Sequence, residues 1–319
     1  MMRPLTAIPT RADIEATHEA IEPLIHRTPV LTCSAIDERA GASLFFKCEN
    51  FQKVGAFKMR GASNAAVRLS EAERRKGLAT HSSGNHAQAV ALSAKMLGVP
   101  AFIVMPENAP AAKRAATEGY GAQITSCENT LAARESTLQK VVDRTGATFI
   151  HPYNDYNVIA GQATCAKELL EDVEGLDILT APVGGGGLMS GTALSARYFA
   201  PGVKVYGAEP EAVDDAYRSL QSGQLQSNTT IDTIADGLRT NLGEKTFDIL
   251  QRELDGIFLV SEAEILQAMR LIWERMKIII EPSCAVPLAA ILKHPEVFAG
   301  KRVGVILTGG NVDLDRLPF

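Results

Sequence analysis

Short apolar or β-branched runs alternate with amphipathic stretches of helical period along most of the chain. The apolar runs predict strands over residues 44–47, 79–81, 101–105, 122–126, 149–150, 178–183, 204–208, 257–260 and 303–307. The amphipathic stretches predict helices over residues 58–69, 85–97, 110–118, 130–144, 158–171, 188–199, 262–276 and 284–292. Strands that alternate with helices of this length are typical of βαβ units, so we expect an α/β fold with mostly parallel sheets and helices on both faces.

Composition and charge narrow the classes of partner. The 319 residues carry a net charge of −5 and form no basic stripe, so nucleic acid is not an expected partner. No apolar run reaches the roughly 18 residues of a membrane-spanning helix, and residues 1–16 lack the apolar region of a signal peptide. The five cysteines form no CxxC pair, which is typical of reduced thiols. We therefore expect a cytoplasmic protein with no membrane partner.

Lys58 belongs to the first of four segments that follow predicted strands, at the edge where open α/β sheets bind ligands. It comes directly after Phe57, at the start of a predicted helix. Burial against an aromatic ring lowers the proton affinity of a lysine, and the neutral amine can then react with an aldehyde. In the alternative interpretation, Lys58 is an exposed charge at a helix start.

Hydroxyl and amide side chains mark two further segments. Ser82, Ser83 and Asn85 stand directly before a predicted helix, where free N–H groups and hydroxyls suit a carboxylate. These residue types are also ordinary N-caps. Thr308 follows the last predicted strand and precedes two glycines, so a flat ring could approach its hydroxyl closely. An ordinary turn would explain that last segment equally well.

The remaining segment is a run of four glycines, Gly184, Gly185, Gly186 and Gly187, between an apolar strand and a helix. Consecutive N–H groups with unrestricted backbone angles can surround a phosphate, assisted by the helix dipole. The spacing is one residue too long for a dinucleotide G-x-G-x-x-G motif, and the chain has no P-loop. A phosphate-bearing cofactor is therefore predicted, and a dinucleotide-dependent oxidoreductase remains an alternative.

Taken together, the segments AFKMRG, SSGNH, GGGG and TGGN occur in this order over nearly the whole chain. They resemble the tryptophan-synthase-β-like family of pyridoxal-phosphate (PLP) enzymes, and within it the serine/threonine dehydratase and serine racemase branch, close to the threo-3-hydroxyaspartate ammonia-lyases. The resemblance implies two open, twisted, mostly parallel sheets with the cofactor in the cleft between domains. It also implies a large domain of residues 1–74 and 153–319 and a small mobile domain of residues 75–152.

The resemblance assigns a role to each of the four segments. It implies that Lys58 carries PLP as a Schiff base and moves a proton, and that Phe57 packs on the pyridine ring. It also implies that Asn85 binds the ring hydroxyl and that Thr308 faces the pyridine nitrogen. The implied phosphate site consists of Gly184, Gly185, Gly186, Gly187 and the Leu188 backbone. Ser82, Ser83 and Asn85 resemble the site of the substrate carboxylate. Ser83 also matches the proton donor on the opposite face in serine racemases.

Two further sites are implied by the racemase branch. Glu209, the Val213 carbonyl and Asp215 match residues that bind Mg²⁺, Mn²⁺ or Ca²⁺, and oxygen ligands suit such hard cations. A solvated acidic turn is the alternative for this segment. A nucleotide effector site is implied by four positions, which are Lys53, Gln88, Tyr120 and Lys277. A homodimer is also implied.

The substrate is a small β-hydroxy amino acid according to the resemblance, and L-serine, L-threonine and L-threo-3-hydroxyaspartate all fit. Arg134 matches an arginine that meets a distal carboxylate, although a surface arginine is the alternative, and Asp236 lies on a loop that closes the pocket. The expected products are a 2-oxo acid and ammonia. Serine racemisation is the near alternative because Ser83 is present, and a non-catalytic PLP-binding protein is the more distant one.

Three residues depart from the family pattern. Ala56 replaces the serine that often precedes Phe-Lys, so one hydroxyl near the cofactor is missing. Cys284 stands where many relatives have glycine or alanine, and it is predicted to be a small buried apolar residue. Tyr153 replaces a phenylalanine or asparagine, which changes the expected shape of the pocket near the substrate.

Overall fold

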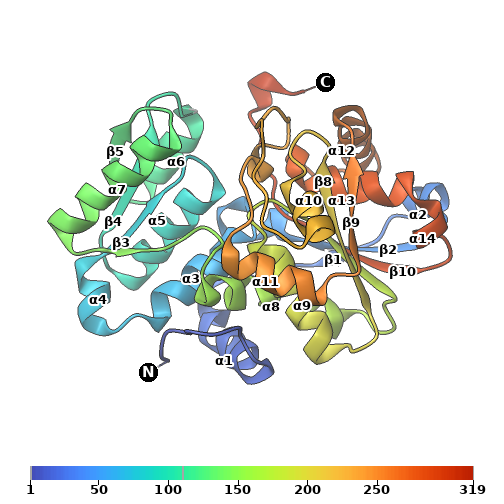
Figure 1. The fold of residues 1–319 in the computed structure, drawn as a ribbon, viewed down its shortest axis with the longest axis horizontal. Helices are drawn as coiled ribbons and strands as arrows, with labels where there is room; N and C mark the ends of the chain where they lie inside the picture. Colours follow the sequence, from blue (N-terminus) through green and yellow to red (C-terminus); the bar gives the residue numbers. More distant parts are fainter. Residues whose placement is uncertain (1, 110, 319) are drawn as a thin grey trace.

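The computed structural model describes residues 2–109 and 111–318, and its strands form two sheets that lie side by side along the long axis (Figure 1). The larger sheet has the order β1-β2-β10-β7-β8-β9, with β1 antiparallel to β2 and the other pairs parallel. The smaller sheet has the order β5-β4-β3-β6 and is parallel throughout. The strands are β1 (Val30–Leu31), β2 (Ser43–Cys48), β3 (Leu78–His81), β4 (Ala101–Pro106), β5 (Gln123–Cys127), β6 (Thr148–Phe149), β7 (Ile178–Pro182), β8 (Lys204–Pro210), β9 (Gly256–Val260) and β10 (Arg302–Leu307).

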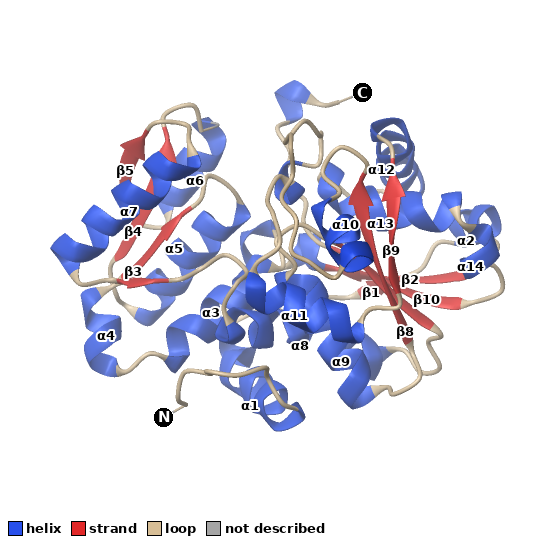
Figure 2. Ribbon diagram, viewed as in Figure 1, coloured by secondary structure: helices blue, strands red, loops and turns tan. Residues whose placement is uncertain are grey.

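Helices surround both sheets, as Figure 2 shows. They are α1 (Arg11–Ile21), α2 (Ser34–Ala40), α3 (Lys58–Arg68), α4 (Glu71–Lys76), α5 (Asn85–Leu97), α6 (Ala111–Gly119), α7 (Leu131–Thr145), α8 (Tyr156–Asp172), α9 (Gly187–Phe199), α10 (Asp215–Ser222), α11 (Glu244–Glu253), α12 (Glu262–Met276), α13 (Pro282–Lys293) and α14 (Pro295–Phe298). Short 3₁₀ turns are η1 (Glu22–Leu24), η2 (Glu49–Phe51), η3 (Lys53–Gly55), η4 (Asp236–Leu238) and η5 (Leu314–Arg316). None of the helices in the described ranges has the length and apolar character needed to cross a membrane.

All nine predicted strands and all eight predicted helices form, with ends that differ by at most two residues. Pro110, the predicted first residue of one helix, lies outside the described residues. Helices α1, α2, α4, α10, α11 and α14 and strand β1 were not predicted. Helix α1 illustrates the reason, because it is largely polar and buries only Ile14, Thr17 and Ile21, which is too few for a clear apolar stripe.

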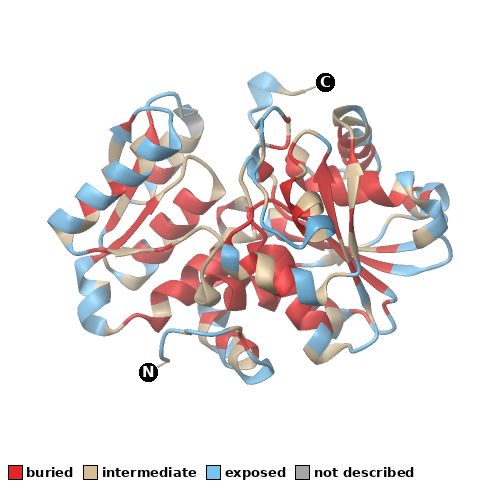
Figure 3. Cartoon of the chain, viewed as in Figure 1, coloured by how far each residue is buried: buried red, intermediate tan, exposed pale blue. Residues whose placement is uncertain are grey.

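The chain passes from the larger sheet to the smaller one through α3 and returns through the segment before α8 (Figure 1). The smaller sheet is built wholly from residues 78–149. Domain boundaries after residues 74 and 152 stay a prediction. Figure 3 shows that the central strands of the two sheets, and the helices α3, α8 and α9 below them, are largely buried, whereas the edge strand β5 is mostly not. Helices α3 and α8 approach so closely that a Cβ atom at Gly161 would lie 2.5 Å from the Arg60 carbonyl oxygen.

A buried network of charges joins α3, α8 and β2. Arg60 donates through Nε to Glu49, 2.7 Å away, and through Nη1 to Glu168, 2.8 Å away. Lys47, which is also fully buried, lies 2.8 Å from Glu168. Burial by itself would raise the pKa of Glu168, but hydrogen bonds from His18 and Arg60 hold that pKa well below its usual value. Each charge is therefore kept in the interior by its partners.

Removal of one member of this network should destabilise the fold strongly. For Glu168→Gln we expect a free energy of unfolding lower by about 3–5 kcal/mol, because buried Lys47 loses its nearest carboxylate and Arg60 keeps only Glu49. Urea unfolding followed by circular dichroism measures this. Glu71→Gln is the control, because Glu71 pairs with Arg75 at the surface and should change stability by less than about 1 kcal/mol. Equal losses in the two variants would contradict the role given to the network.

Candidate active site

Lys58 is the first residue of α3 and its amine is held in the interior. Its Nζ donates to the Pro152 carbonyl oxygen at 2.9 Å and lies 5.1 Å from the centre of the Phe57 ring. Burial lowers the pKa of Lys58 to about 8, although the negative charge of Glu281 raises it in part. The neutral amine is therefore accessible near neutral pH, as a nucleophile or proton acceptor requires.

The end of β10 lies against the segment that leads into Lys58. Phe57 donates its N–H to the Thr308 carbonyl at 3.0 Å, and Ala56 pairs with Gly309 as an isolated bridge. Thr308 is only 2% exposed, yet its hydroxyl has no hydrogen-bond partner among the described residues. Because an unpaired buried hydroxyl costs free energy, this group fits a polar atom of a bound ligand.

Asn85, the first residue of α5, connects the two sheets. Its amide nitrogen donates to both carboxylate oxygens of Glu281, at 3.0 and 3.1 Å, and its oxygen accepts from Asn311 at 2.9 Å. Burial, with repulsion from Asp236 second, raises the pKa of Glu281 to about 7. Sequence reasoning missed Glu281 and Asn311. Asn311 ends the TGGN segment and was within reach of the motif, whereas no spacing rule marks a carboxylate at the start of α13.

The four glycines form the turn between β7 and the N-terminus of α9, as predicted from the sequence. Gly186 has a φ of +82°, which favours glycine, and a Cβ atom at Gly185 would lie 2.3 Å from the Tyr153 ring. Leu188 follows in the first turn of α9, whose N–H groups have no partner within the helix. These features fit the binding of a phosphate. Tyr153 covers the turn and accepts a hydrogen bond from Thr240 at 3.0 Å.

Ser82 and Ser83 lie in the loop between β3 and α5. The Ser82 hydroxyl accepts from the Gly84 N–H at 3.2 Å, and the Ser82 N–H donates to the Val104 carbonyl at 3.1 Å. His86, in the first turn of α5, has its pKa lowered to about 3 by burial and by the charge of Lys58. The start of α5 therefore lies near the Lys58 amine, although no hydrogen bond joins either serine to it among the described residues.

Arg134 lies on α7, which packs on the smaller sheet, whereas Asp236 lies in η4. Arg134 donates to Asn129 at 2.9 Å, while its buried Nε has no partner in the part of the chain that the structure describes. Burial lowers the pKa of His81, at the end of β3. The negative charge of Glu135 partly offsets this shift, and the positive charge of Arg134 adds to it. Asp236 forms an ion pair with Lys113 of α6, with Nζ and Oδ2 2.7 Å apart.

Glu209 and Asp215 lie together at the start of α10, and both are buried. Glu209 accepts from the Tyr217 N–H at 2.8 Å, and Asp215 accepts from Leu242 and Asn228 at 2.7 Å. Burial raises the pKa of Asp215 to about 6, and burial with repulsion from Asp215 raises that of Glu209. Two carboxylates that repel each other in the interior have the chemistry of a hard-cation site.

The cation site would need ligands besides carboxylates. The described residues contain no group of three or more His, Cys, Asp and Glu side chains arranged for a metal. Val213, in the turn before α10, is buried and could contribute its carbonyl oxygen. The four positions of the suggested nucleotide site lie in η3, in α5, after α6 and at the end of α12, and no hydrogen bond or ion pair joins any two of them among the described residues.

Comparison with known proteins identifies the class. The model of the family described as pyridoxal-phosphate dependent enzyme matches residues 21–309, and the chain belongs to this family. It is 54% identical over 312 residues to the β-hydroxyaspartate dehydratase of Paracoccus denitrificans, covering 98% of this chain and 99% of that protein. It is 49% identical to the L-threo-3-hydroxyaspartate ammonia-lyase of Saccharomyces cerevisiae, covering 97% and 95%. The serine racemase of Dictyostelium discoideum is 51% identical, with coverage of 99% and 98%.

Solved structures confirm the predicted tryptophan-synthase-β-like fold. The crystal structure of the Dictyostelium discoideum serine racemase superposes with a TM-score of 0.92 at 52% identity, covering 96% of this chain and 99% of that one. The maize serine racemase gives a TM-score of 0.95 at 42% identity, with coverage of 98% and 95%. The residues of the site fit PLP, because they offer a desolvated lysine, an unpartnered hydroxyl and a glycine turn at a helix start. The dinucleotide alternative gains no support.

The depressed pKa of Lys58 can be tested before cofactor is added. In the apoprotein, acetylation of Lys58 should rise with a midpoint near pH 8, because burial lowers its pKa to about 8. Glu281→Gln removes a charge that raises this pKa, so the midpoint should move to lower pH. Mass spectrometry of the labelled peptides measures both, with the exposed Lys204 as an internal reference for the reagent. A midpoint that rises in the variant would refute the assignment.

Proposed function

We propose that this protein is a PLP-dependent ammonia-lyase that removes water and then ammonia from small β-hydroxy amino acids. The observation that carries the proposal is the desolvated Lys58 amine. The preceding residue, Phe57, contacts the backbone of Thr308, whose buried hydroxyl has no partner among the described residues. Relatives named as a β-hydroxyaspartate dehydratase and an L-threo-3-hydroxyaspartate ammonia-lyase support this reaction class.

PLP, when bound, would supply an electron sink for the α-carbon of the substrate. Lys58 would hold the cofactor, and its freed amine would remove the α-proton. The Ser82–Asn85 loop would bind the substrate carboxylate at the start of α5. Loss of the β-hydroxyl, with the proton that Lys58 has removed, would release water and an enamine, and one water would then hydrolyse the enamine to a 2-oxo acid and ammonia. Lys58 would thus hold the cofactor and move a proton, and the Ser82–Asn85 loop would orient the substrate.

Among the three candidate substrates, L-threo-3-hydroxyaspartate is favoured by Arg134. Its Nε is buried without a partner among the described residues, and its charge reaches His81, the residue directly before Ser82. A guanidinium with a free N–H can take a second carboxylate of the substrate in bidentate geometry. The ion pair of Asp236 with Lys113 of α6 supports a role of the loop around Asp236 in closing the pocket.

Serine racemisation is the second candidate function. Ser83 lies in the loop before α5 and matches the proton donor of serine racemases, so it would supply a proton from the opposite face of the substrate. Relatives named serine racemase, at 51% identity in Dictyostelium discoideum and 48% in Schizosaccharomyces pombe, support this candidate. The two activities share every step up to removal of the α-proton, and they differ in whether the hydroxyl then leaves.

A divalent cation at Glu209, the Val213 carbonyl and Asp215 belongs to the same proposal, with the raised pKa values of the two carboxylates in support. Mg²⁺, Mn²⁺ and Ca²⁺ all prefer oxygen ligands. A homodimer is supported by the exposed apolar side chains of Phe51 and Ile279, whose segments are joined by the hydrogen bond from Asn50 to the Ile279 carbonyl.

A cytoplasmic location remains part of the proposal and rests on the cysteine usage and the lack of sequence signals for export or membrane insertion. A nucleotide effector rests on the resemblance. Lys53 and Lys277 would supply the positive charge that nucleotide phosphates require, and Gln88 and Tyr120 would be the further contacts.

Purified protein loaded with PLP should release 2-oxo acid and ammonia from at least one of L-serine, L-threonine and L-threo-3-hydroxyaspartate. In Arg134→Ala we expect kcat/KM to fall roughly 10- to 100-fold for 3-hydroxyaspartate and to change little for serine, because only the former has a second carboxylate. Coupled assays of oxo acid, ammonia and enantiomer measure this. Arg144→Ala, at the exposed end of α7, is the matched control.

Several outcomes would change this assignment. Equal losses on the two substrates in Arg134→Ala would remove the carboxylate role. D-serine as the main product from L-serine would favour the racemase candidate. Turnover that survives in Lys58→Ala would refute the role of Lys58.

The cation should stabilise the protein more at high pH. The folded-state pKa of Asp215 is raised from 3.8 to about 6, so its contribution to stability is present below about pH 4 and is lost as the pH rises through 6. Because Mg²⁺ binds the ionised carboxylate, it should raise the melting temperature by roughly 2–5 °C at pH 8 and by less at pH 5. Thermal unfolding with Mg²⁺ or chelator measures the difference.

Asp215→Asn should abolish this cation-dependent rise, whereas Asp248→Asn, at an exposed position of α11, should keep it. A rise of the same size in both variants would place the cation elsewhere.

A further inference from the structure

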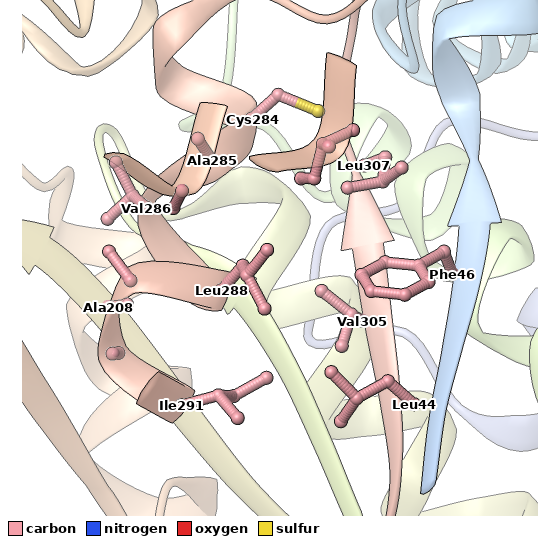
Figure 4. Packing of buried hydrophobic residues seen from close by; sticks show 14 of the residues in the cluster. Leu44, Phe46, Ala208, Cys284, Ala285, Val286, Leu288, Ile291, Val305 and Leu307 are labelled. Atoms are coloured by element: carbon pink, nitrogen blue, oxygen red, sulfur yellow. The ribbon is translucent and has the colours of Figure 1, made fainter. Parts of the chain in front are cut away.

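Cys284, a fully buried residue of α13, lies next to Thr308 at the end of β10. The Glu281 N–H donates to the Gly309 carbonyl at 3.0 Å and the Cys284 N–H donates to the Glu281 carbonyl at 3.0 Å, so backbone contacts fix the start of α13 against residues 308–309. Figure 4 shows the Cys284 sulfur pointing from α13 toward the end of β10 beside Leu307. The position is therefore set by the fold.

The thiol stays protonated in this environment. Burial raises the pKa of Cys284 far above its ordinary value, and the Gly309 N–H and the nearby Thr308 hydroxyl offset only part of that rise. A protonated thiol has one hydrogen to donate and is a weak donor. Fully buried between α13 and β10, Cys284 has Thr308 as a polar neighbour on its side chain.

The Thr308 hydroxyl can still turn in either direction. Its carbonyl is held by the Phe57 N–H, but its Oγ1 makes no hydrogen bond to a described residue. A hydroxyl has one proton and two lone pairs, so it can either donate to a ring nitrogen or accept from one that is protonated. Whichever partner binds its lone pair decides the direction of its proton.

We propose that Cys284 is a positioning residue whose S–H donates to Thr308 Oγ1 once PLP is bound, so that the Thr308 hydroxyl turns its own proton to the pyridine nitrogen and keeps that nitrogen unprotonated. The two hydrogen bonds, from the Cys284 S–H to Thr308 Oγ1 and from the Thr308 O–H to the ring nitrogen, are cooperative because each polarises the next. Together they give the buried thiol and the buried hydroxyl a partner. The inference rests on the proposed PLP site, and it assigns this chain's departure from glycine or alanine a chemical role.

The test uses holoenzyme loaded with ¹⁵N-labelled PLP and reads the protonation of the ring nitrogen by ¹⁵N NMR, without substrate. In Cys284→Ala the ratio of unprotonated to protonated nitrogen should fall about two- to fivefold, since one hydrogen bond of modest strength is lost. Cys284→Ser keeps a donor and should restore the wild-type ratio. Cys165→Ala, a buried cysteine of α8, is the matched control and should leave the ratio unchanged.

A second measurement tests the proposal even if Cys284→Ala does not fold. In wild-type protein, the infrared S–H stretching band of Cys284, assigned by its loss in Cys284→Ser, should move to lower frequency when PLP binds. In Thr308→Val the band should stay at the frequency of a free thiol. An unchanged ratio in Cys284→Ala, or an S–H band that ignores PLP, would overturn the proposal. Absence of PLP absorbance in wild-type protein would instead refute the proposed function.

Discussion

The buried ion network around Arg60 is the constraint on which the site depends. Arg60 lies two residues after Lys58 on α3, and its guanidinium is bound by Glu49 and Glu168 from two other elements. Because a guanidinium fork accepts little deviation from bidentate geometry, the start of α3 cannot rotate without breaking buried ion pairs. The Lys58 amine is thereby aimed at the Pro152 carbonyl, which lies before the segment that covers the glycine turn. A structural network thus sets the direction of a reactive group.

The site itself is assembled from both halves of the molecule. Asn85 follows β3 of the smaller sheet, whereas its partners Glu281 and Asn311 flank α13 and β10 beside the larger one. The pair of Lys113 with Asp236 makes a second connection between the same halves. An apolar cluster also joins the halves, because Met59 of α3 and Val90 of α5 belong to the same core. The surroundings of Glu281 combine groups from both halves, since Asp236 raises its pKa whereas Asn85 and Lys113 lower it.

The local sequence pattern was sufficient to predict the helices and strands, but it was insufficient to predict the roles of the buried charged residues. The bounds of α5 and α12 follow from their sequence, because strong apolar periodicity and capping signals act within one helix. The roles of Glu281 and of Arg60 could not be predicted in this way. Each depends on partners from distant segments, more than 100 residues away for Arg60 and Glu168, and no periodicity reports such a contact. The order of the motifs predicted the glycine turn and Lys58, whereas the residues that surround them could be identified only from the structure.

Three of the six unpaired buried polar atoms among the described residues belong to segments of the predicted site. They are the Thr308 hydroxyl, the His86 Nδ1 atom and the Arg134 Nε atom. Each such group destabilises the free protein by about 1–3 kcal/mol, so a fold selected only for stability would remove them. A ligand that offers a ring nitrogen and a second carboxylate would satisfy two of the three. A ligand that pairs with these groups would stabilise the folded protein, so the free energy of unfolding would rise with the concentration of that ligand.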